Sequence, residues 1–149
     1  MAATQHSLRI PEPLETELNR EIARRGAGEW SSGVLEILDE AVRMARAPGI
    51  VFVEGRGGRR AAVAHSGLDV WEIIATWIEA GRDGKKLQAA YAELTELQLR
   101  SALNYYALYP TDIDARLAIE AEWTAERVAA DMPFSQPVVA HKARRSAGA

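Results

Sequence analysis

The spacing of apolar residues changes along the chain, and each change predicts a different kind of element. Residues 5–10 alternate between apolar or aromatic side chains and polar ones, which is typical of a half-buried strand. Pro11 ends this run because proline cannot donate to a strand ladder. Apolar residues then recur every three or four positions, which predicts helices, apart from a β-rich interruption over residues 50–64.

Two helices are predicted directly after the strand. The first covers residues 12–25 and ends at Gly26, and the second begins at a capping Ser31 or Ser32 and ends before Pro48. The apolar stripe of the second helix is wide enough to predict burial on more than one side. Neither helix could bury its stripe alone in a unit of about 45 residues, so the pattern favours a dimer.

The strand over residues 5–10 is too short to be stable alone and needs a partner. If that partner is the same strand of a second copy, the ribbon exposes Gln5, Ser7 and Arg9 twice on one face. Such a ribbon has the width that a DNA major groove admits. The alternative is an ordered arm that pairs with the hairpin further along the chain.

Residues 50–64 predict that hairpin. A β-rich run from Ile50 to Val53 is followed by a glycine-rich turn and a weaker apolar run. The arginines Arg56, Arg59 and Arg60 crowd the turn. They are either solvated or in contact with phosphate.

Helices are predicted over most of the chain from residue 66 to about residue 130. Ser66 caps the first of them, a short helix covers residues 84–92, and Thr95 caps a helix over residues 96–109. The last helix begins at a cap formed by one of two adjacent residues, Thr111 or Asp112.

Residues 131–149 lose periodicity and predict a flexible tail. Its apolar anchors Met132 and Phe134, followed by Arg144 and Arg145, suit a segment that folds onto an acidic groove. The alternative is a tail that only keeps the protein soluble.

Composition narrows the possible functions. The 149 residues carry a net charge of −3, so any DNA contact has to come from local placement of basic groups or from their doubling in a dimer. There is no cysteine, no apolar run of membrane-spanning length and no signal-peptide pattern, which predicts a cytoplasmic protein. We find no metal-ligand spacing, phosphate loop or nucleophile–base pair, and expect neither a cofactor nor an enzyme.

The run Q-H-S-L-R-I-P-E-P-L, followed by a helix, a glycine turn and a serine-led helix, resembles the ribbon-helix-helix family of small dimeric repressors and antitoxins. The resemblance covers residues 5–46. It implies that the outward strand residues read DNA bases and that the start of the second helix binds a backbone phosphate. The implied DNA-binding residues are Gln5, Ser7, Arg9, Ser31 and Ser32. One departure is Glu29, a negative charge where the phosphate should approach.

Residues 50 to about 123 resemble a bacterial family catalogued as domain of unknown function 433. The similarity rests on Tyr-x-x-Leu-Thr at residues 91–95 and Ala-Leu-x-Tyr-Tyr at residues 102–106, while residues 63–67 depart from the usual pattern. It implies a tri-helical, homeodomain-like unit, commonly encoded beside nuclease toxins of the PIN-type fold. If a helix-turn-helix forms here, Gln98 and Arg100 could make a second DNA contact. The alternative is a structural or partner-binding unit.

These inferences together predict a mainly α fold in three parts. Residues 1–48 form a dimeric ribbon-helix-helix segment, residues 49–130 a hairpin with a tri-helical domain, and residues 131–149 a flexible tail. The expected function is that of a VapB-like antitoxin of a type II toxin–antitoxin system, which binds operator DNA as a homodimer. Its C-terminal half would neutralise a PIN-type ribonuclease toxin, with contacts from Met132, Phe134, Arg144 and Arg145. The alternatives are a stand-alone transcriptional regulator and a dimeric adaptor that does not bind DNA.

Overall fold

The computed structural model describes residues 2–55, 57–123, 127 and 130–131. The chain divides into two units, residues 1–108 and residues 109–149, and each is described by itself. Over the described residues the chain is mainly helical, with six helices and one two-stranded antiparallel hairpin, as predicted. None of the helices in this part of the chain is long and apolar enough to cross a membrane.

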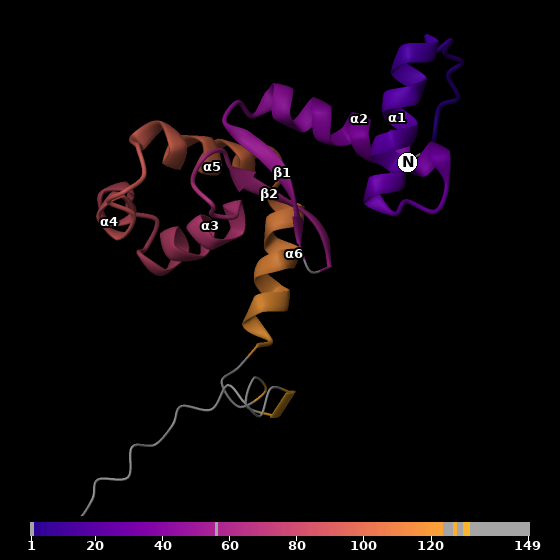
Figure 1. The fold of residues 1–149 in the computed structure, drawn as a ribbon. Coiled ribbons are helices and arrows are strands. Elements are labelled where there is room, and N and C mark those ends of the chain that lie inside the picture. Colours follow the sequence, from indigo (N-terminus) through magenta and orange to yellow (C-terminus); the bar gives the residue numbers. More distant parts are fainter. Residues whose placement is uncertain (1, 56, 124–126, 128–129, 132–149) are drawn as a thin grey trace, which may run out of the picture. The chain divides into compact units, whose positions relative to one another are not determined.

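The hairpin is the centre of the first unit. It consists of β1 (Ile50–Gly55) and β2 (Gly58–Val63), in a register that pairs Ile50 with Val63 at its base. In Figure 1 the hairpin lies between the pair α1–α2 and the helices α3–α5. The predicted hairpin is therefore confirmed, and it contacts both helical groups.

Helices α1 (Glu12–Arg25) and α2 (Trp30–Arg46) form the N-terminal pair, close to the predicted limits. Gly26 ends α1 with a φ of 67°, a left-handed conformation that glycine adopts without steric cost. The two helices approach closely at Gly33, because a Cβ atom there would lie 2.8 Å from Cγ1 of Ile22.

Helices α3 (Val70–Glu79), α4 (Gly84–Ala90) and α5 (Glu96–Leu108) supply most of the core. α3 packs against α4 and α5, and both α3 and α5 contact β2. The ring of Tyr105 meets that of Phe52 edge-on at 6.3 Å, which joins α5 to the hairpin. The large side chains with almost no exposed surface are Tyr105, Ile73, Ile74, Leu87, Val63 and Val70.

The caps of these helices were predicted with mixed success. Thr95 caps α5 as expected, with its Oγ1 accepting from the Gln98 amide at 3.2 Å and the Gln98 side chain accepting from the Thr95 amide at 2.9 Å. The prediction for Ser66 was wrong. Its hydroxyl closes a turn by donating to the Val63 carbonyl, and Asp69 caps α3 through a capping box with Glu72.

The second unit contains α6 (Pro110–Ala121). A cap at Thr111 or Asp112 was wrong, because Pro110 occupies the first helical turn and Tyr109 is the N-cap. Proline suits that position, since its missing N–H would have had no helical partner. The helix also ends at Ala121, earlier than predicted.

Candidate functional site

The arm over residues 2–11 has no regular secondary structure in the single chain, so the strand predicted for residues 5–10 is not formed there. A strand needs a partner for its N–H and C=O groups. The expected alternative partner is not used, because the sheet in the described part of the chain contains only β1 and β2. Gln5, Ser7 and Arg9 are all exposed, and Leu8 on the other face is 76% exposed.

Helix α2 turns its apolar stripe outward. Leu35 is 66% exposed, Leu38 48% and Val42 56%, whereas the side of the helix that faces the protein buries Gly33 and Glu40. The prediction that α2 is buried on more than one side is therefore wrong for the single chain. The physical reason is that α1 and the hairpin together cover only one face of the helix.

The start of α2 differs from the prediction as well. The helix begins at Trp30, and the N-cap Glu29 makes no side-chain capping bond, so capping by Ser31 or Ser32 was wrong. Both serines lie exposed in the first turn, where backbone N–H groups have no helical acceptor. The indole of Trp30 donates a hydrogen bond of 2.7 Å to Oδ1 of Asn19, which ties this turn to α1.

A network of ion pairs joins α1, α2 and the hairpin. At its centre, the buried carboxylate of Glu40 accepts from Arg59 of β2 and, at 3.1 Å, from Nη2 of Arg25. Glu21 bonds to Arg25 at 2.7 Å and also to Arg24, whose Nη1 lies 3.2 Å from Oε2 of Glu54. The network therefore links residues on both sides of the domain boundary expected at residue 48.

Within this network the pKa values of Glu21, Arg24 and Arg25 are shifted. Hydrogen bonds from Arg24 and then Arg25 lower the pKa of Glu21 to about 2. The hydrogen bond to Glu21 raises the pKa of Arg24 above its usual value. Burial of Arg25 acts to lower its pKa, but hydrogen bonds to Glu21 and Glu40 outweigh burial and raise it. All these groups are thus held in their charged forms near neutral pH.

The sequence analysis missed the role of Glu40. The available signal was its place seven residues after Gly33, on the face of α2 opposite the apolar stripe. The expectations for the hairpin arginines were also wrong where they can be checked. Arg59 pairs with Glu40, and Nε of Arg60 lies 2.7 Å from Oδ2 of Asp69, while Arg56 lies outside the described residues.

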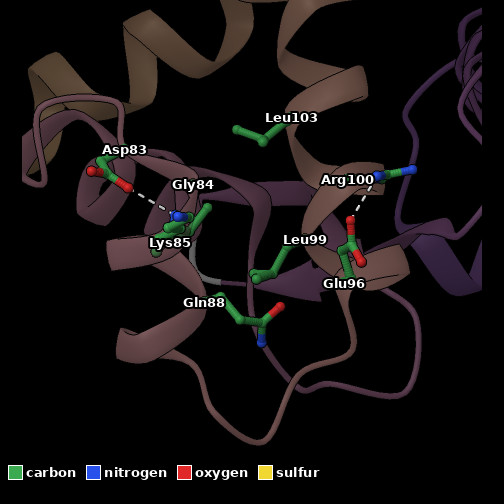
Figure 2. A pocket seen from close by; sticks show the side chains of 9 residues that line it. Asp83, Gly84, Lys85, Gln88, Glu96, Leu99, Arg100 and Leu103 are labelled. Atoms are coloured by element: carbon green, nitrogen blue, oxygen red, sulfur yellow. Dashed lines mark hydrogen bonds and ion pairs between the residues drawn. The ribbon is translucent and has the colours of Figure 1, made fainter.

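Helices α4 and α5 enclose a pocket of about 710 Å³ (Figure 2). Leu87, Leu99 and Leu103 give it an apolar lining, and charged side chains stand at its edges. Figure 2 shows Arg100 beside Glu96, with a separation of 2.6 Å between Nη2 and Oε1.

The two residues expected to make a second DNA contact differ in exposure, since Arg100 is exposed to solvent and Gln98 is half-buried. Arg100 carries its own carboxylate partner, Glu96. The side chain of Gln98 accepts from Thr95 and donates to the Ala64 carbonyl at 3.2 Å, so both ends of its amide are engaged inside the unit. The internal bonds of Gln98 leave its amide little free for DNA, whereas Arg100 remains accessible.

The tail contacts expected from Met132, Phe134, Arg144 and Arg145 lie outside the described residues. Within the residues that the structure describes, no group of three or more His, Asp or Glu side chains is placed to hold a metal ion. No family model matches the chain, and no curated protein or solved structure was found to be similar to it.

Proposed function

We propose that this chain is a dimeric, operator-binding antitoxin of a type II toxin–antitoxin system. The observation that carries the proposal is the outward apolar stripe of α2, together with a largely exposed arm over residues 2–11 that pairs with no strand in the described part of the chain. A stripe of this kind is what an interface between identical copies buries. A second copy supplies a partner both for the stripe and for the arm.

In the proposed dimer the two arms pair as an antiparallel ribbon. The ribbon presents Gln5, Ser7 and Arg9 from each copy to the major groove, while Leu8 and Ile10 face the helices. Arg9 pairs bidentately with a guanine, and Gln5 or Ser7 reads a neighbouring base. The first-turn amides of α2, with Ser31 and Ser32, hold a backbone phosphate.

Local placement of charge is consistent with this binding mode. Because the net charge is −3, affinity has to come from a few basic groups that the dimer doubles. Glu29 lies next to the phosphate position and weakens that contact, so the ribbon supplies most of the specific affinity.

The second half of the proposal is neutralisation of a PIN-type ribonuclease. It rests on the sequence resemblance of residues 50 to about 123. In this proposal the tail carries Met132, Phe134, Arg144 and Arg145 into the acidic groove of the toxin. A stand-alone regulator would share the DNA-binding half and lack this step.

The DNA-binding half is tested by gel-shift titration of the upstream DNA at two salt concentrations. Arg9→Ala should cost about 1–3 kcal/mol of discrimination between operator and mismatched DNA. Arg20→Ala is the matched control, because Arg20 is exposed on α1 and pairs only locally with Glu17. Unchanged operator binding by Arg9→Ala would show that the arm is not the reader.

The toxin-binding half is tested by pull-down of the nuclease encoded by the adjacent gene. The full chain should retain the nuclease, and a chain truncated after Ala130 should lose it. Retention by the truncated chain would remove the tail from the contact. Absence of any nuclease gene next door would favour the stand-alone regulator.

A further inference from the structure

A small hollow lies beside the base of the hairpin, and the proposed function does not use it. Its volume is about 260 Å³, and its lining is largely apolar, with contributions from Pro48, Gly49, Ala64, His65 and Leu97. This is below the roughly 300–1,000 Å³ that small-molecule sites occupy. Leu97 lies in the first turn of α5 and is 74% exposed, which is a high exposure for a leucine. The hollow is suited to one large apolar side chain.

Trp30 is an aromatic residue that its own chain covers only in part, although its indole N–H donates to Asn19. It is 44% exposed and stands at the first position of α2, whereas the hollow follows the end of the same helix. The 17 residues of α2 extend about 25 Å, so Trp30 cannot reach the hollow of its own chain. Only a second copy could bring a Trp30 there.

The position of the apolar stripe on α2 sets how two copies would meet. Leu35, Leu38 and Val42 are centred on the middle of the helix. Two copies that pack antiparallel about this centre place the start of one α2 beside the end of the other. If the twofold axis is perpendicular to the plane of the two helices, residues that project to one side of that plane do so in both copies.

Trp30 is the first residue of α2, and Pro48 follows two positions after its last residue, Arg46, so an antiparallel pair brings Trp30 of one copy near Pro48 of the other. Charges at the two ends agree with the pairing, since the exposed Glu29 precedes Trp30 and the exposed Arg46 precedes the hollow. Each contact between the start of one α2 and the end of the other would bring one acidic and one basic residue near each other.

We infer that in the dimer Trp30 of each copy seats in the hollow between Pro48 and Leu97 of the other copy. This inference rests on the dimer of the proposed function and adds to it two aromatic anchors outside the α2 stripe. Tryptophan in a desolvated pocket is a recurrent source of interface affinity. The two Trp30 contacts would also fix the register of the α2 pair, and with it the position of the paired arms.

Because the chain contains no cysteine, a thiol crosslinker can join two chains only through cysteines that are introduced by substitution. Two singly substituted chains, Trp30→Cys and Leu97→Cys, are mixed, allowed to exchange subunits and treated with a short bifunctional maleimide. The mixture should give a covalent dimer that neither chain gives alone. An Ala90→Cys chain is the control partner for Trp30→Cys and should stay uncrosslinked, because Ala90 lies on α4 and does not line the hollow.

Dimer affinity gives a second measurement that does not depend on crosslinking. Trp30→Ala and Leu97→Ala should each weaken dimerisation at least about tenfold, and the double variant should be little weaker than either single one. Ile78→Ala, an exposed apolar position on α3, should leave the affinity unchanged.

The outcomes separate this inference from the proposed dimer. A dimer that forms while the mixed chains stay uncrosslinked and the two alanine effects simply add would overturn the seating of Trp30 and leave the dimer standing. A chain that remains monomeric at all concentrations would overturn both. Crosslinking in the mixture with non-additive alanine effects would support both.

Discussion

Helix α2 carries most of its large apolar side chains on the outside, whereas α3 and α5 bury most of theirs, with Leu97 and Ile78 as exposed exceptions. Leu35, Leu38 and Val42 face solvent in the single chain, while Ile73, Ile74 and other core side chains are fully buried. The region over residues 50–108 therefore completes its own core. The region over residues 2–46 leaves the apolar stripe of α2 exposed in the single chain, and in the proposed dimer a second copy covers it.

The first prediction compares one residue from each region. Ile73→Ala should destabilise the fold by about 2–5 kcal/mol, because it empties a fully buried site. Leu35→Ala removes a side chain of the same size from the surface and should change the stability of the monomer by less than about 0.5 kcal/mol. Urea denaturation measured at two protein concentrations checks both.

The dependence on protein concentration distinguishes the effects of Ile73→Ala and Leu35→Ala. The loss in Ile73→Ala should appear at every protein concentration, whereas any loss in Leu35→Ala should grow as the dimer becomes populated. A large, concentration-independent loss in Leu35→Ala would mean that the stripe already belongs to the core of the single chain.

The second prediction concerns the link between the two regions. Glu40→Ala should lower the free energy of unfolding by about 2–3 kcal/mol. This is at or below the usual cost of breaking a buried ion pair, because Arg59 keeps some contact with water. The variant leaves Arg25 and Arg59 without their shared carboxylate. Thermal unfolding measures the loss, and Asp39→Ala, an exposed carboxylate on the same helix, is the control.

Glu40→Ala should also loosen α1 and α2 from the hairpin more than it disturbs α3–α5. Amide hydrogen exchange by segment would show this as faster exchange in residues 12–46 with little change in residues 70–108. Equal acceleration across both segments would mean that the two regions unfold as one body.

Local signals explain which parts of this architecture could be predicted. Gly26 ends a helix because it can adopt a positive φ, and Thr95 caps one because Gln98 stands three residues later; neighbouring residues decide both. Ser66 has the residue type of an N-cap, but the capping box that begins α3 is formed by Asp69 and Glu72, three residues apart.

The parts that sequence could not predict depend on partners far apart in the chain. Glu40 finds Arg25 and Arg59 only after α1, α2 and the hairpin have packed, and no periodicity marks that contact. The outward orientation of the α2 stripe could not be predicted for the same reason. Its apolar pattern showed that a face must be covered, but not whether the cover lies within the same chain.

The third prediction tests the close approach of α1 and α2 at Gly33. In Gly33→Ala the new Cβ would lie 2.8 Å from Cγ1 and 2.9 Å from Cγ2 of Ile22, so α1 and α2 must move apart. The cost of overpacking exceeds the gain in helix propensity and leaves a net loss of about 1 kcal/mol. Gly28→Ala, which meets nothing within 4 Å, should be nearly neutral in the same thermal unfolding experiment.

The smallest expected effect is a pH dependence confined to the N-terminal region. The pKa of Glu21 falls from 4.5 to about 2 in the folded chain because Arg24 and Arg25 hydrogen-bond to its carboxylate. A depressed pKa means that the unfolded state binds the proton more readily. The stability that Glu21 contributes is therefore fully present above about pH 4.5 and is lost as the pH falls towards 2.

Replacing Glu21 isolates this contribution from the other carboxylates. The stability difference between the native chain and Glu21→Gln should shrink as the pH is lowered from 5 towards 2, while Glu36→Gln, at an exposed position on α2, should show no such trend. Denaturant titrations at half-unit pH steps supply the comparison. Because the side chain of Glu21 is 34% exposed and that of Glu40 only 10%, the trend should also weaken in high salt, unlike the loss in Glu40→Ala. If the Glu21→Gln difference stayed constant through this pH range, the carboxylate of Glu21 would not be held by Arg24 and Arg25 in solution.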